Sequence, residues 1–215
     1  MEQTNSRWLF IFLVMSLISI FLFPQRAHAD SNWLKYFRKD SLLNTYKTSY
    51  AVLDDTLWTG TFGDGLTVHD GQKTVTFTNR NTRTSPSNDD GLVSDYITCI
   101  SIDEKRGRIW LGTNAGLASC DLEGKEWERY TEKQGLPNDV IRDLAIDSYG
   151  YLWVGTPSGI ARYDGEKWQI FNESNGLVQA SVHSIKVKGD NVWVGSVGGT
   201  VSRFKDGEWK TFINF

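Results

Sequence analysis

The stretch IRDLAIDSYGYLWVGTPSGIARYDGEKWQIF, residues 141–171, decides the fold. It holds four short segments rich in β-branched and aromatic residues, and Asp, Gly and Ser separate them. This pattern is typical of strands linked by tight hairpins. Apolar residues form no sustained stripe at helical spacing after residue 30, so helix is not expected there. The stretch therefore predicts one four-stranded antiparallel sheet.

The same unit recurs along the chain. The copies run approximately over residues 46–79, 96–131, 140–172 and 181–213, and each contains Trp-x-Gly followed by Thr or Ser. The tryptophans of these motifs lie 52, 43 and 40 residues apart: Trp58, Trp110, Trp153 and Trp193. A repeat of this length suits a four-stranded propeller blade. We therefore predict an all-β fold, a β-propeller or partial propeller of four four-stranded blades.

The spacing within Trp-x-Gly has a physical reason. Alternation along a strand places the tryptophan and the glycine on one face, and the glycine leaves room there for a neighbouring blade. Burying a tryptophan removes about 200 Å² from water, which contributes at most about 5 kcal/mol. We expect all four tryptophans in the core between blades. Three tryptophans of the predicted outer strands are expected to pack as well: Trp127, Trp168 and Trp209.

Residues 1–29 differ from the rest. Arg7 precedes an apolar run from Trp8 to Phe23, and the small-residue pattern Ala27-His-Ala29 follows it. The run is short for a membrane span, and Ala-x-Ala is typical of a signal-peptidase site. We predict a cleaved signal peptide and a periplasmic or secreted chain without a membrane span; the alternative is an uncleaved N-terminal anchor.

Charge limits the class of partner. Removing Arg7, Arg26 and Glu2 from 23 basic and 26 acidic residues leaves 21 and 25, a net charge of −4. The remaining Lys and Arg residues form no cluster in the sequence. A nucleic-acid partner is therefore not expected, and an anionic membrane surface is disfavoured.

Both cysteines fall on predicted strands. Cys99 aligns with the first strand of its copy and Cys120 with the third. Strands two places apart are separated by about 9–10 Å, which is beyond the reach of a disulfide. We expect two buried free thiols.

Residues 30–215 hold one strand more than four blades need. Trp33-Leu-Lys-Tyr36 matches Trp127-Glu-Arg-Tyr130 and predicts an extra N-terminal strand, while the last copy already has a fourth strand at Trp209-Lys-Thr-Phe212. Three arrangements stay open. The chain forms a four-bladed ring, or a homo-oligomer completes a larger ring, or the chain is a shortened relative of longer proteins.

Residues 135–165, GLPNDVIRDLAIDSYGYLWVGTPSGIARYDG, resemble the two-component regulator propeller repeat. The resemblance extends more weakly over residues 33–215. Proteins with this repeat usually carry it in extracytoplasmic sensor domains, often ahead of a histidine kinase, and no kinase region accompanies it here. The resemblance implies an exported recognition module.

The sequence shows no catalytic constellation. His69 and His183 lie at non-equivalent repeat positions without metal-ligand spacing, and neither a nucleophile elbow nor a phosphate loop is present. We predict no catalytic residue, no metal and no cofactor, and an exported non-catalytic module that binds an unknown ligand or protein partner. The alternatives are a propeller-based lyase or hydrolase, for which His183 with Arg142 and Asp143 is the one candidate group, and a structural subunit of a cell-surface assembly.

A binding site is expected where the copies differ. Loops that enter each first strand and loops between second and third strands should emerge on one face, around a central channel. The polar insertion Asn79–Asp90 enters a first strand there too, whereas Asp103, Asp147 and Asp164 recur at turns and should cap them. The candidate ligand-binding residues are Phe62, Asp64, Tyr96, Asn114, Arg142, Asp143, Ser158 and His183.

Overall fold

The computed structural model describes residues 47–84 and 90–213. All of them fall in one compact unit. The predicted signal peptide at 1–29 and the predicted extra strand at Trp33–Tyr36 lie outside the described residues. No helix in the described part is long and apolar enough to cross a membrane.

The described residues form four antiparallel sheets of four strands, each in chain order. Blades 1 and 2 contain β1 (Lys47–Leu53), β2 (Thr56–Thr61), β3 (Leu66–His69), β4 (Thr74–Phe77), β5 (Ile97–Asp103), β6 (Arg108–Thr113), β7 (Gly116–Asp121) and β8 (Glu128–Tyr130). Blades 3 and 4 contain β9 (Asp143–Ile146), β10 (Leu152–Thr156), β11 (Gly159–Tyr163), β12 (Trp168–Phe171), β13 (Val182–Lys188), β14 (Asn191–Ser196), β15 (Thr200–Lys205) and β16 (Glu208–Ile213). The predicted all-β propeller architecture is confirmed.

Two short 3₁₀ helices connect the blades, although the sequence predicted no helix. They are η1 (Glu132–Gln134) and η2 (Glu173–Asn175), and each has a reciprocal capping box, built by Thr131 with Gln134 in η1. Thr-x-x-Gln is a recognisable helix start, so the sequence carried this signal. Both helices lie between blades, so each blade keeps its four strands.

Aspartates close the hairpins as predicted. The Oδ1 atom of Asp147 accepts hydrogen bonds from the backbone N–H groups of Tyr149 (3.0 Å) and Tyr151 (2.9 Å). Asp164 and Asp103 accept backbone N–H groups in their own turns in the same way. These bonds satisfy turn amides that no neighbouring strand reaches.

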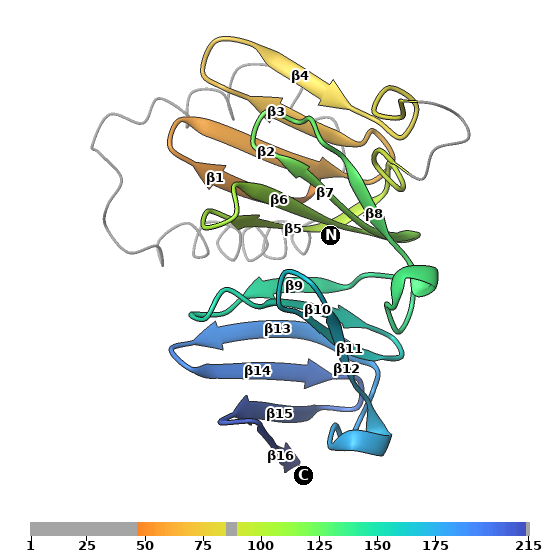
Figure 1. Ribbon diagram of the computed structural model, residues 1–215, viewed down its shortest axis with the longest axis vertical. Helices are drawn as coiled ribbons and strands as arrows, with labels where there is room; N and C mark the ends of the chain where they lie inside the picture. The colour runs from red at the N-terminus through yellow and green to blue at the C-terminus, as the bar shows by residue number, and fades with distance from the viewer. Residues whose placement is uncertain (1–46, 85–89, 214–215) are drawn as a thin grey trace, which may run out of the picture. The chain divides into compact units, whose positions relative to one another are not determined.

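The blades pack face to face in chain order. In Figure 1 they follow one another from top to bottom, and the first strands β1, β5, β9 and β13 of successive blades contact each other. Three core clusters fill the three junctions, and each contains the tryptophan of the earlier blade. Trp58 packs on blade 2, Trp110 on blade 3 and Trp153 on blade 4. These three tryptophans are buried, as predicted.

The glycine of each motif makes the close approach possible. A Cβ atom on Gly155 would lie 2.7 Å from Cγ1 of Val182 in the next blade. A Cβ atom on Gly60 would lie 2.6 Å from Cγ2 of Ile97. Real Cβ atoms do not come this near to another side chain, so only glycine lets the next blade pack here.

The fourth copy departs from the prediction. Trp193 is only half-buried, and its ring lies against Phe212 (5.6 Å between centroids) and Arg203 of its own blade. A Cβ atom on Gly195 would meet only the Oγ atom of Ser184, again within blade 4. The expectation of four equivalent inter-blade anchors is wrong at Trp193, because no described blade comes after the fourth.

The outer-strand tryptophans and the cysteines behave as expected. Trp168 stacks on Tyr163 (4.6 Å), and Trp127 packs on Phe77 of the preceding blade (5.8 Å). Trp209 lies edge-on to Trp153 at 6.2 Å. Cys99 and Cys120 are free and buried, and burial raises the pKa of each thiol to about 12. These side chains belong to the core.

Candidate functional site

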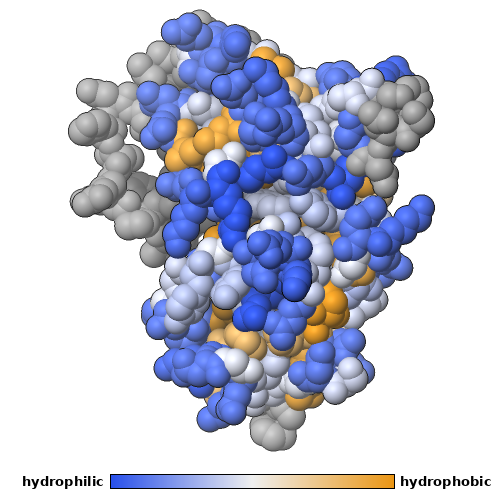
Figure 2. Space-filling model, viewed as in Figure 1, coloured by the Kyte–Doolittle hydropathy of each residue, from blue (hydrophilic) through white to orange (hydrophobic). Residues whose placement is uncertain are grey.

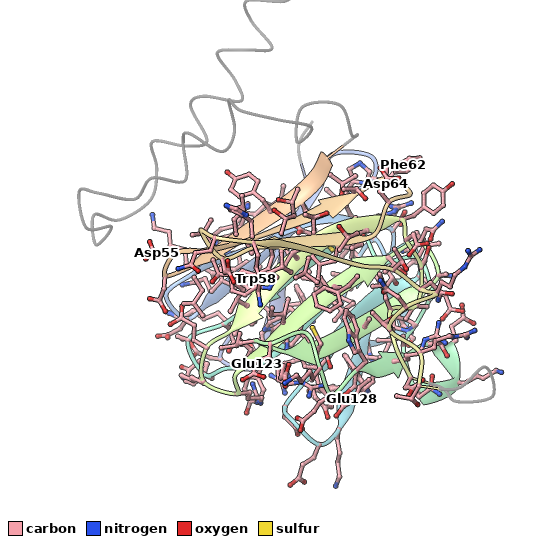
Figure 3. All side chains as sticks on the ribbon, turned by 90° about the horizontal axis from the view of Figure 1, so that it is seen from above. Asp55, Trp58, Phe62, Asp64, Glu123 and Glu128 are labelled. Carbon is pink, nitrogen blue, oxygen red and sulfur yellow. The ribbon has the colours of Figure 1, made fainter. Side chains whose placement is uncertain are left out.

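The loops that enter first strands and the loops between second and third strands meet at one end of the blades. The backbone N–H of Gly63, between β2 and β3, donates to the carbonyl of Asp95 ahead of β5 (3.1 Å). Asn114 donates to Tyr96 in the same manner (3.3 Å). Figure 3 shows Phe62 and Asp64 at one end of blade 1 and Asp55 at the other. We call this end the loop face.

Two exposed aromatic rings lie side by side on the loop face. Phe62 and Tyr96 meet edge to face, with 4.8 Å between ring centroids and an interplanar angle of 90°. Phe62 is 62% exposed and Tyr96 is 42% exposed. A backbone bridge between the two residues joins blade 1 to blade 2 and fixes the pair. The rings therefore form an exposed apolar surface that the backbone bridge holds in place.

Polar groups surround the aromatic pair. The Oγ atom of Ser94 donates to Oδ1 of Asn114 (2.7 Å) and accepts the N–H of Tyr96 (3.2 Å). Asp64 is exposed, and its backbone N–H bonds to Oγ1 of Thr61 (3.0 Å). The structure thus brings Phe62, Asp64, Tyr96 and Asn114 together, as a loop-face site requires. Ser94 was not predicted from the sequence. It could have been found as a polar residue in the loop before a first strand, at the position that aligns with Asn138.

Arg142 and Asp143 join blade 3 to blade 4. The Nη1 atom of Arg142 donates to Oγ of Ser181 (3.1 Å) and to the carbonyl of Val182 (3.0 Å). The Oδ2 atom of Asp143 accepts the backbone N–H of Ile185 (2.7 Å). Burial raises the pKa of Asp143, and hydrogen bonds from the Ile185 and Leu144 amides oppose that rise. These contacts assign both side chains to the junction between blades.

Replacing Asp143 with asparagine is expected to change the pH dependence of stability. The pKa of Asp143 in the folded chain is raised above its value of about 3.9 in the unfolded chain. Between these two pKa values, the folded chain binds more protons than the unfolded chain. The stability of the unsubstituted chain relative to Asp143→Asn should therefore fall as pH rises through the raised pKa. Urea unfolding across acidic pH measures this difference, and Asp55→Asn at an exposed turn is the control. A difference that does not vary with pH would refute the assignment.

Ser158 and His183 do not join the aromatic pair. The Oγ atom of Ser158 lies 3.4 Å from Nδ2 of Asn138, so these residues form a second, smaller polar contact on the loop face. His183 is exposed on β13 and, within the described residues, forms no hydrogen bond with Arg142 or Asp143. No group of three or more His, Cys, Asp or Glu residues that could hold a metal occurs in the described ranges.

The side of the molecule in Figure 2 is mostly hydrophilic, with small separate hydrophobic patches. Arg108 illustrates how polar side chains cover the sheets. Its guanidinium donates to Oγ of Ser119 (2.6 Å) and lies 3.3 Å from the Glu128 carboxylate. Among the described residues, most large exposed apolar side chains lie on the loop face or on blades 1 and 4, and Leu122 and Tyr149 lie in turns of blades 2 and 3.

Residues 135–158 match the two component regulator propeller family. The chain is also 32% identical over 157 residues to Histidine kinase P4 of Formosa agariphila, covering 69% of this chain and 11% of the kinase. The chain therefore spans about a tenth of the length of that relative.

Solved structures share the fold at low sequence identity. The extracellular domain of a hybrid two component system of B. thetaiotaomicron aligns with a TM-score of 0.68 and 20% identity, over 82% of this chain and 26% of that one. Virginiamycin B lyase of Staphylococcus aureus aligns with a TM-score of 0.61 and 16% identity, over 80% and 56% of the two chains. The same architecture thus occurs in an extracellular domain and in an enzyme.

Proposed function

We propose that this set of four propeller blades, with its two-component regulator propeller repeat at residues 135–158, is an exported non-catalytic recognition module of the sensor type. Three features support export and sensing. Residues 1–29 have the pattern of a signal peptide, the matching structure from B. thetaiotaomicron is an extracellular domain, and the matching part of the F. agariphila protein lies in a histidine kinase. The module binds a ligand or protein partner on its loop face.

The Phe62–Tyr96 pair carries the proposal. At the other two described junctions, the equivalent loop positions hold Asn114 and Pro157 in place of Phe62, and Val140 and Ser181 in place of Tyr96. Of the three described blade junctions, only the one between blades 1 and 2 carries such an exposed aromatic pair, which the repeat itself does not require. Exposed aromatic rings bounded by polar groups are typical of recognition surfaces. We therefore place ligand contact at Phe62, Tyr96, Asp64 and Asn114.

The contacts of two polar side chains support the non-catalytic part of this proposal. Arg142 and Asp143 are engaged in cross-linking blades 3 and 4, as their hydrogen bonds to Val182 and Ile185 show. A group that holds two blades together is poorly placed to exchange protons with a substrate. This observation favours recognition over a lyase or hydrolase activity for the chain.

Thermal unfolding in the presence of candidate ligands tests the proposal. The panel contains oligosaccharides, whose sugar rings have apolar faces bounded by hydroxyl groups, and short peptides that carry aromatic side chains between polar backbone groups. A ligand at about 100 times its Kd stabilises the folded state by about 2.7 kcal/mol. We expect a ligand that raises the unfolding temperature of the unsubstituted chain and has no effect on Phe62→Ala or Tyr96→Ala.

The matched control is Tyr149→Ala. Tyr149 is also an exposed aromatic residue, but it lies in the β9–β10 turn, at the end of the blades opposite the loop face. The ligand-induced shift should persist in this variant. A panel in which every shift survives in both loop-face variants would contradict the proposed site.

A further inference from the structure

Among the described residues, blades 1 and 4 each expose one face of the kind that forms a blade junction. Blade 4 presents Val201 and Phe212 beside Trp193, and blade 1 presents Tyr50 and Val52 on β1. These four side chains are between 38% and 46% exposed. At each internal junction, the face that carries the tryptophan packs against the first strand of the next blade. The exposed face of blade 4 is the one that carries the tryptophan, and the exposed face of blade 1 is the one that would pack against such a face.

Strand register shows that the blade 1 face is equivalent to a buried one. Tyr50 pairs with Thr59, two positions before the repeat threonine at 61, and Ile100 pairs with Leu111, two positions before Thr113. Val52 and Ile102 correspond in the same way. Ile100 and Ile102 pack against the cluster that contains Trp58 of the preceding blade. Tyr50 and Val52 therefore occupy positions that, at an internal junction, contact the tryptophan side of another blade.

A bulge residue ties each first strand to the next one. Register shifts occur at Thr48, Thr98 and His183, and Arg142 holds the same position in blade 3. Thr98 donates to the carbonyl of Ile141 (2.7 Å), Arg142 donates to that of Val182 (3.0 Å), and Thr48 donates to that of Ile97. His183 is the fourth member of this series and is exposed. In this series the acceptor is always the carbonyl just before the bulge residue of the next blade. For His183, the equivalent acceptor would be the carbonyl of Lys47, just before Thr48, in a blade 1 that follows blade 4.

The exposed face of blade 4 carries basic side chains, and blade 1 carries acidic ones. In blade 4, the residues paired across the four strands at the level of the tryptophan are Lys186, Trp193, Arg203 and Lys210. The equivalent residues in blade 2 are Ser101, Trp110, Ser119 and Glu128. Blade 1 carries Asp54 and Asp55 in its β1–β2 turn. Turns of this kind touch across internal junctions, since Ser148 Oγ donates to Asp190 Oδ1 of the next blade (3.2 Å). A basic face on blade 4 thus matches an acidic turn on blade 1.

We propose that a second copy of this chain covers both faces, with blade 4 of each copy packed on blade 1 of the other. The two new junctions are identical and reproduce the three internal ones. Two copies supply eight blades, which is within the range of about four to eight found in closed propellers, and a head-to-tail contact that closes leaves no free face. His183 of one copy then bonds to the Lys47 carbonyl of the other. In this ring the first strands of all eight blades line one central channel.

Light scattering on the purified chain tests the assembly. We expect a mass twice that of one chain. Val201→Glu and Tyr50→Glu should each give single chains, because a carboxylate would be buried at one half of every junction. Both side chains are exposed within a single chain, so the circular dichroism spectrum of β structure should persist. Val178→Glu, at an exposed loop-face position, is the control and should keep the doubled mass.

Mixing the two variants identifies which faces meet. Blade 4 of the Tyr50→Glu chain and blade 1 of the Val201→Glu chain are both intact, so an equimolar mixture should regain a doubled mass through one sound junction. A single-chain mass for the unsubstituted protein would overturn the proposal. So would a Tyr50→Glu variant that pairs with itself, or a mixture that stays as single chains. These readouts do not involve the loop-face ligand, so the assembly and the proposed function can fail separately.

Discussion

Replacing Trp153 with alanine is expected to lower the free energy of unfolding by about 3–5 kcal/mol, the range for a large buried aromatic residue. Trp153 is fully buried between blades 3 and 4. Its ring stacks on Phe171 (5.8 Å, 20°) and lies 5.1 Å from Phe204 of the next blade. Its Nε1–H donates to Oδ2 of Asp147 (2.8 Å), so the substitution also removes a hydrogen bond from the turn.

Denaturant unfolding followed by circular dichroism measures this loss. Tyr149→Ala, which removes an exposed aromatic ring four residues earlier, should change the free energy of unfolding by less than about 0.5 kcal/mol. A Trp153→Ala variant as stable as Tyr149→Ala would mean that the motif tryptophans do not hold the blades together.

Replacing Gly112 with valine is expected to destabilise the chain by about 1–3 kcal/mol or more through overpacking. A Cβ atom at this position would lie 2.7 Å from Cγ2 of Ile141 and would also press on Sγ of Cys99. Both neighbours are buried in the junction between blades 2 and 3, so neither can move aside freely. Relief requires the two blades to separate, which exposes their shared core.

Gly195→Val is the matched comparison, because Gly195 holds the same motif position in blade 4. Its Cβ atom would meet only Oγ of Ser184, at 2.8 Å, a small side chain in the same blade. At a concentration low enough to keep single chains, Gly195→Val should cost less than Gly112→Val. Equal losses in thermal or urea unfolding would show that the glycine serves its own strand and not the adjoining blade.

Most of the fold could be predicted from the sequence, because the repeat places the same constraints in every copy. Asp147 and Asp164 cap turns wherever the hairpin needs an acceptor, and Gly60 and Gly155 leave space wherever another blade packs against theirs. Trp193 shows the limit of this reasoning. Its Trp-Val-Gly segment is identical to that at Trp153, but burial of the ring depends on an adjoining blade, and the motif does not encode whether one is present.

The candidate site was predicted less completely. Repeat logic found Phe62 and Tyr96 because they differ from their counterparts in sequence. It also selected Arg142 and Asp143, which differ for another reason, since they bond to Val182 and Ile185 across a junction. Sequence variation marks both ligand contacts and blade-specific packing. Separating the two requires knowledge of which backbone groups lie opposite, which the chain order does not contain.

The central claim is that the tryptophans of the Trp-x-Gly motifs are buried in the junctions between blades and are therefore not available for recognition. ¹⁹F NMR of the chain labelled with 5-fluorotryptophan tests this most directly, with resonances assigned by single Trp→Phe substitutions and a soluble paramagnetic agent added. We predict that the signals of Trp58, Trp110 and Trp153 stay sharp, and that Trp193 broadens in the Tyr50→Glu variant, where blade 4 is uncovered. Broadening of any of the first three to the extent seen for free 5-fluorotryptophan would contradict the account.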